Sequence, residues 1–162
     1  MPFAGASIGK LRCRTGLPGR TGAWAHDLRA VAHTGRTTLL AHPYLIPLLG
    51  TRPPVTEPAF TLWESMTFIL LDRGLSEEQA ADEADCLGRL LIGHALAEAG
   101  QPPGDVGGGE EEHRQAQAVL PAARYPALSR VQQANVVHDP DRIFKLALDG
   151  LILALQAHHP ED

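Results

Sequence analysis

The chain has 162 residues, of which 44% are hydrophobic and 20% charged, values typical of one globular domain with a buried core. Alanine and leucine dominate, aromatic residues reach only 5%, and this composition favours helices. The formal charge of −5 is uneven: residues 1–52 carry seven basic residues against one acidic residue, whereas residues 53–162 carry seven against eighteen, so the main body should repel nucleic acid.

The first part of the chain divides into an aperiodic segment and a helix. Residues 1–21 form a basic N-terminal segment that we expect to be disordered, because glycine is frequent and no apolar period appears. A helical domain over 22–159 follows. Apolar residues recur at helical spacing from Trp24, and Pro43 ends this helix. The stretch "YLIPLLG" then predicts a short helical turn broken by Pro47.

Two longer helices come next. The first runs from about Glu57 to Arg73, with its polar residues in one arc and its apolar residues opposite, and Gly74 supplies a stop. The second begins at a capping box formed by Ser76 and Gln79 and runs to about Ala99.

The last third alternates weak and strong signals. Residues at about 100–110 form a loop by composition, and weaker helical patterns cover 111–120 and 127–135. Asp139 then caps a final helix and Pro140 takes its first position.

The stretch "FKLALDGLILAL" contains Asp149-Gly150, a dipeptide typical of turns. A hairpin does not fit, because "LILAL" does not alternate. As a helix, the polar residues from Arg142 to Gln156 gather in an arc of ~60°, with Lys145 and Asp149 paired four residues apart. The rest of the circumference is apolar, so this helix must be covered on several sides.

The long helix that begins at the Ser76–Gln79 capping box also becomes apolar on nearly all sides in its second half. A small monomer can bury one such helix, but two favour a two-fold dimer with a four-helix interface. The interface residues that we predict are Ile92, Leu96, Phe144, Leu148, Leu151, Ile152 and Leu155.

Two helices also carry residues suited to a ligand pocket. Large, adaptable apolar groups with few charges suit a small hydrophobic molecule, although an ordinary core explains the same residues. His94 lies on an apolar face, where it is either a ligand contact or a hydrogen-bonded core histidine. The candidate ligand-binding residues are Phe60, Trp63, Met66, Thr67, Leu90, Leu91 and His94.

Motifs for catalysis and metal binding are absent. The eight histidines match no metal-binding spacing, and neither a G-x-S-x-G nucleophile motif nor a phosphate loop is present. We therefore predict no catalytic residue, no metal and no cofactor. Cys13 and Cys86 match no redox spacing and no apolar run reaches the ~20 residues of a membrane helix, which favours a cytoplasmic protein.

Three stretches together resemble the C-terminal domain of tetracycline-repressor (TetR) type regulators, over about residues 22–158. They are "AWAHDLRAVAHTGRTTLLAHPYLIPLLGTRP", "LDRGLSEEQAADEADCLGRLLIGHALAEAG" and "DRIFKLALDGLILAL". The resemblance implies an all-α multi-helix bundle that binds a small ligand and dimerises through two helices of each chain, here about 77–99 and 141–158. It also implies an N-terminal helix-turn-helix domain that binds operator DNA.

Two departures from the family pattern qualify this expectation. Only 23 residues precede Trp24, too few for a three-helix head, so we expect DNA binding only through an N-terminal domain absent from this chain. Arg89 stands where tetracycline-binding members have a metal-ligating histidine, so tetracycline–magnesium is not the expected effector.

The predicted function is the ligand-sensing and dimerisation domain of a TetR-like transcriptional repressor that forms a homodimer and binds a small hydrophobic effector. Two alternatives stay open. One is a head-less helical protein that pairs with a full-length regulator, and the other is a small helical carrier or enzyme.

Overall fold

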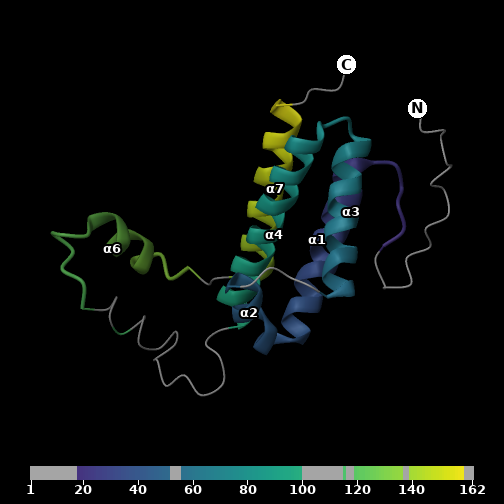
Figure 1. Cartoon of the computed structure of the whole chain (residues 1–162). Coiled ribbons are helices and arrows are strands. Elements are labelled where there is room, and N and C mark those ends of the chain that lie inside the picture. The colour runs from purple at the N-terminus through teal and green to yellow at the C-terminus, as the bar shows by residue number, and fades with distance from the viewer. Residues whose placement is uncertain (1–17, 52–55, 100–114, 116–118, 137–138, 159–162) are drawn as a thin grey trace, which may run out of the picture.

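The computed structural model describes residues 18–51, 56–99, 115, 119–136 and 139–158. All regular elements in these ranges are helices, which confirms the all-α prediction. The bundle consists of four long helices, α1 (Trp24–Ala41), α3 (Glu57–Asp72), α4 (Glu77–Ala99) and α7 (Pro140–His158) (Figure 1). A 3₁₀ turn, η1 (Pro43–Leu45), and α2 (Ile46–Thr51) cover one end, whereas α6 (Pro126–Gln133) lies apart from the bundle.

Helix α4 is the centre of the arrangement, because it contacts α1, α2, α3 and α7. Its apolar stripe packs into one continuous core, and each large side chain that is fully buried contributes roughly 1.5–3 kcal/mol of transfer free energy. The largest side chains in that core are Leu28, Met66, Ile69, Leu70, Leu87, Leu91, Phe144, Leu148 and Ile152.

The predicted start of α4 is confirmed in its hydrogen bonds. The Ser76 amide donates to Oε1 of Gln79 at 3.0 Å, and the Gln79 amide donates to Oγ of Ser76 at 3.3 Å. Two amides that have no partner within the helix are satisfied in this way. Just before this cap, Gly74 has a φ of +100°, a conformation that glycine adopts without steric cost.

The start of α7 is also as predicted. The Asp139 carboxylate accepts hydrogen bonds from the amides of Asp141 at 3.0 Å and Arg142 at 3.4 Å. Because the carboxylate satisfies these free amides, Asp139 defines where the helix begins.

Asp149 lies within α7 and does not form a turn. It pairs with Lys145 one turn earlier and accepts a hydrogen bond of 2.9 Å from Nε of Arg29 on α1. The dipeptide Asp149-Gly150 is therefore a helical polar edge that joins α7 to α1.

Some element boundaries differ from the expectation. Pro47 does not break the helical turn, because it lies in the first turn of α2, where a missing amide removes no helical hydrogen bond. Helix α6 begins at Pro126, one residue before the predicted 127–135 segment, for the same reason. The loop at 100–110 lies outside the described residues, as do most of 111–120, most of 1–21 and His159 at the end of the predicted domain.

No helix in the described part of the chain combines the length and the apolarity needed to cross a membrane.

Candidate ligand-binding site

Three helices converge closely at two glycines. A Cβ atom placed on Gly88 of α4 would lie 2.5 Å from Cζ2 of Trp63, so the indole of this α3 residue rests on the backbone of α4. A Cβ atom on Gly35 of α1 would lie 3.1 Å from Cδ1 of Leu91 and 3.3 Å from Cδ2 of Leu62. The absence of two side chains therefore brings α1, α3 and α4 together at one junction.

Two of the predicted ligand-binding residues, Trp63 and Leu91, lie at this junction, and others are buried in or against the same core. Met66 and Leu91 are fully buried in the core, and Trp63 and Leu90 are partly buried against it. Thr67 is half-buried on α3 next to Met66.

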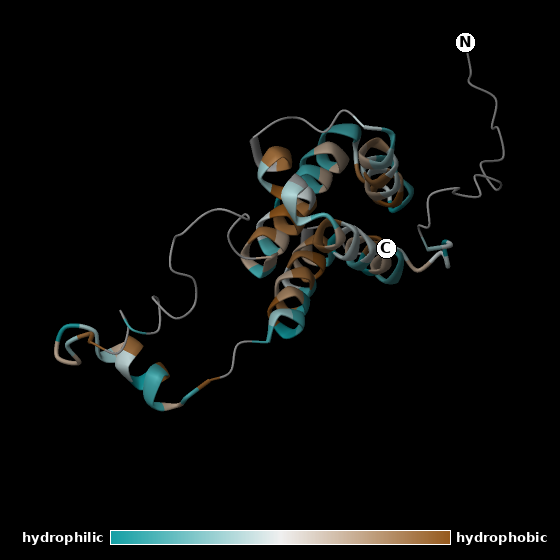
Figure 2. Ribbon diagram, turned by 90° about the horizontal axis from the view of Figure 1, so that it is seen from below, coloured by the Kyte–Doolittle hydropathy of each residue, from teal (hydrophilic) through white to brown (hydrophobic). Residues whose placement is uncertain are grey.

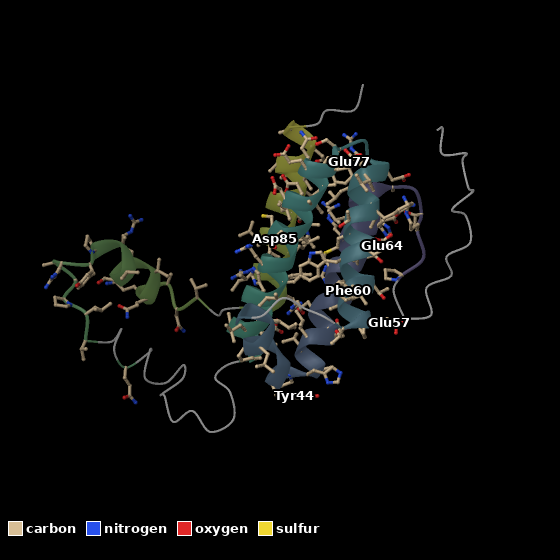
Figure 3. The ribbon with its side chains drawn as sticks, viewed as in Figure 1. Tyr44, Glu57, Phe60, Glu64, Glu77 and Asp85 are labelled. Carbon is tan, nitrogen blue, oxygen red and sulfur yellow. The ribbon has the colours of Figure 1, made fainter. Side chains whose placement is uncertain are left out.

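Phe60 does not join this group. Its side chain is 59% exposed, on the stretch of α3 between Glu57 and Glu64, which are also exposed (Figure 3). Helical spacing alone groups Phe60 with Trp63, but the Phe60 side chain lies on an exposed side of α3.

His94 belongs to a cluster around the ring of Phe144. The ring centroids of His94 and Phe144 are 5.5 Å apart in an edge-on arrangement, and His33 of α1 approaches the same ring at 5.1 Å. The guanidinium carbon of Arg36 lies 4.9 Å from the ring centroid. Side chains from α1 and α4 therefore surround one aromatic ring of α7, in geometries that favour aromatic and cation–π contacts.

Arg36 is the polar centre that the sequence did not predict. Its Nε and Nη2 atoms donate to the two carboxylate oxygens of Glu98 at 2.8 Å each, and Nη1 donates to Asp141 at 2.7 Å. The bond with Glu98, together with Asp141 and against the effect of burial, raises the pKa of Arg36 above its ordinary value. A sequence signal existed, since Arg36 follows Leu28 and Ala32 at intervals of four on the buried face of α1.

A second polar cluster ties the start of α1 to the residues before it. The buried Asp27 carboxylate accepts hydrogen bonds from the Thr21 amide at 2.9 Å, from the Thr21 hydroxyl at 2.7 Å and from the Gly22 amide at 3.1 Å. Burial raises the pKa of Asp27, but the hydrogen bonds from Thr21, Gly22 and His26 outweigh it and lower the pKa below its ordinary value of 3.8.

In the ranges that the structure describes, no three histidine, cysteine, aspartate or glutamate side chains lie close enough together to bind one metal ion. Arg89 is exposed and pairs with Asp85 on the outside of α4, so it points away from the junction.

The residues predicted for the dimer interface differ in how far they are exposed within one chain. Four of the seven residues, Phe144, Leu148, Ile152 and Leu155, are at most 3% exposed and belong to the chain's own core. These side chains lie in the core that α7 shares with α4, and α1 also contacts the ring of Phe144. Ile92 and Leu151 are half-buried, and only Leu96 is well exposed.

A different apolar stripe of α7 is exposed to solvent. Ile143, Leu146 and Leu153 are 40%, 75% and 62% exposed, and Gly150 lies between them at heptad spacing. We call these four residues the outer face of α7. Figure 2 shows α7, the helix reached from α6 by the thin trace, as apolar along most of its length. The apolar part of the circumference that the sequence predicts is thus divided into a core face and an outer face on opposite sides.

Comparison with known proteins identifies the domain. Residues 17–158 match the family model described as "Tetracyclin repressor-like, C-terminal domain". The chain belongs to this family. The resemblance stated from sequence is confirmed, and the TetR-type domain covers all the helices described above.

Solved structures of TetR-family proteins share the fold. ActR from Streptomyces coelicolor in complex with actinorhodin has a TM-score of 0.69 and 26% identity, over 90% of this chain and 69% of that chain. The complex of ActR with (S)-DNPA gives 0.69 and 25%, over 88% and 68%. SCO7222, a TetR from the same organism, gives 0.68 and 21% over 89% and 69%, a likeness of fold alone. A search of curated proteins finds no match.

Proposed function

We propose that this TetR-type domain is the ligand-sensing and dimerisation domain of a transcriptional repressor, with a small hydrophobic molecule as its effector. The similarity to ActR supports the ligand-sensing role, because ActR has been solved in complex with actinorhodin and with (S)-DNPA. The family model supports a regulatory role over residues 17–158.

The effector site that we propose is the junction of α1, α3 and α4. Trp63 offers a flat apolar wall there, while Met66 and Leu91 supply the buried floor. Thr67 and His94 are half-buried polar groups that can orient a ligand. Since Arg89 is on the outside of α4, the proposed effector is not a magnesium chelate held at that position.

The proposed homodimer uses the outer face of α7 together with the adjoining surface of α4 around Leu96. An exposed heptad stripe is the pattern that helices bury against each other in four-helix interfaces. Operator DNA would be contacted by a separate N-terminal helix-turn-helix domain of the kind found in TetR-type regulators.

A thermal-shift experiment tests the sensing role. Actinorhodin serves as the first probe, followed by a panel of hydrophobic metabolites and drugs. A ligand at 100 times its dissociation constant stabilises the fold by ~2.7 kcal/mol, which raises the melting temperature by roughly 5–10 °C. Trp63→Ala and His94→Ala should reduce this shift, whereas Phe60→Ala, at an exposed position on α3, should retain it. Equal shifts in all three variants would place the ligand elsewhere.

A further inference from the structure

Trp63 occupies space that only a glycine on α4 can leave free. A Cβ atom on Gly88 would lie 2.5 Å from Cζ2 and 2.7 Å from Cη2 of the indole, distances far inside van der Waals contact. The obstacle is a rigid ring and not the flexible end of an aliphatic chain. Any larger residue at position 88 must therefore displace the indole from its present position.

The backbone does not require glycine at this position. Gly88 lies in the middle of α4 with ordinary helical geometry, since the described glycines with positive φ are Gly22 and Gly74. Glycine in a helix interior costs stability relative to alanine. A Cβ atom on Gly93 of the same helix would meet nothing within 4 Å, so the restriction at position 88 comes from Trp63.

Trp63 is the adjustable wall of the junction. Its neighbours Met66 and Leu91 are 0% and 1% exposed, so moving either one opens the core. The indole is only partly buried and packs on the edge of that core. Because part of the indole is exposed, displacing it costs less packing than displacing a fully buried residue, and a flat aromatic ligand can stack on its face.

We propose that Gly88 is a specificity-determining residue of the ligand site: by seating the Trp63 indole against α4, it sets the room left for a flat, apolar aromatic ligand. This inference rests on the proposed function, because it concerns how the same site selects ligands by their size. A larger residue at position 88 pushes the indole into the ligand's space and narrows the site.

A double-mutant cycle tests the contact between Gly88 and the Trp63 indole without any ligand. Gly88→Ala should lower the folding equilibrium constant about tenfold while Trp63 is present, because the added methyl overpacks the ring. In the Trp63→Ala background the same change should raise the constant about fivefold, since alanine is then only the better helix former. Gly93→Ala is the matched control and should have the same effect in both backgrounds. A Gly88→Ala effect that is equal in both backgrounds overturns the inference.

Dye binding tests the specificity itself. With 1-anilinonaphthalene-8-sulfonate as the probe, Gly88→Ala should weaken binding about tenfold with Trp63 present and by less than about twofold with Trp63→Ala. Binding that does not respond to residue 88 overturns this inference and leaves the proposed ligand site intact. If the dye binds neither the parent protein nor Trp63→Ala, the proposed site fails and the inference fails with it.

Discussion

At the scale of single residues, Arg36 joins three helices through one side chain. A buried guanidinium is stable only when its charge and its donors are matched, and Glu98 and Asp141 provide that match from α4 and α7. The ring of Phe144 covers the guanidinium and is itself contacted by His33 and His94. The contacts link a proposed ligand contact, His94, to the helix that carries the outer face.

Removing this arginine should destabilise the domain. Arg36→Met leaves Glu98, whose side chain is 24% exposed, without its partner, and we expect a loss of about 2 kcal/mol in the free energy of unfolding. Lys145→Met is the matched control, because the Lys145–Asp149 pair is exposed on the lysine side and solvent screens it, so its loss should change stability much less. Urea denaturation measures both, and equal losses would contradict the proposed joining role of Arg36.

Asp27 predicts a pH dependence of stability. Its pKa is lowered in the folded chain, so the stabilisation is fully present above the ordinary value of 3.8 and is lost as the pH falls through the lower folded pKa. Asp27→Asn should cost about 2 kcal/mol at pH 7, and this difference from the parent protein should shrink below pH 3.8. Denaturation at a series of pH values measures the difference, and one that stays constant down to strongly acidic pH would exclude this role.

At the scale of elements, α7 has two apolar faces with different tasks. The core face carries Phe144, Leu148 and Ile152, all buried against the bundle. The outer face lies on the opposite side and is exposed. Lys145 and Asp149 form part of the polar edge between them, and the Arg29 hydrogen bond to Asp149 orients α7 by joining this edge to α1.

The two faces predict opposite results for the same substitution. Leu146→Glu or Leu153→Glu should abolish the proposed dimer and leave the helical content unchanged, because these side chains are exposed within one chain. Leu148→Glu should unfold the chain, since an unpaired buried carboxylate costs several kcal/mol. Light scattering at micromolar concentration and circular dichroism measure the two effects. A parent protein that scatters as a ~17 kDa monomer would rule out the dimer.

At the scale of the whole molecule, charge separates the body from the N-terminal residues. Acidic residues lie along the exposed surfaces of α3 and α4, including Glu57, Glu64, Glu77 and Asp85 (Figure 3). The sequence from residue 53 onward has a balance of −11, from seven basic and eighteen acidic residues. This surface opposes approach to a DNA backbone.

We therefore expect no sequence-selective DNA complex from the 162-residue chain. Weak binding through Lys10, Arg12, Arg14 and Arg20 should disappear as salt rises, because it depends on counterion release. Arg20 is in addition engaged by Asp72 and the Phe68 ring. Gel shifts at ~150 mM salt against random genomic fragments are the measurement, and a selective complex would refute this expectation.

The sequence by itself determined the four long helices and the residues that start or stop several of them. Signals such as the Ser76–Gln79 box, Gly74 and Asp139 act within a few residues, so their hydrogen bonds and dihedral angles follow from local chemistry. The order of these elements was enough to indicate the TetR-type family, and the helical period placed Met66 and Leu91 in the core.

Only the tertiary structure decided which apolar face of α7 is buried. A helical wheel shows that Phe144 and Leu146 are both apolar, but the choice between them depends on the neighbours that α1 and α4 supply. The pairing of Arg36 with Glu98, and the indole of Trp63 on Gly88, likewise join residues 62 and 25 positions apart. Such contacts depend on how helices pack, and local propensity carries no information about that packing.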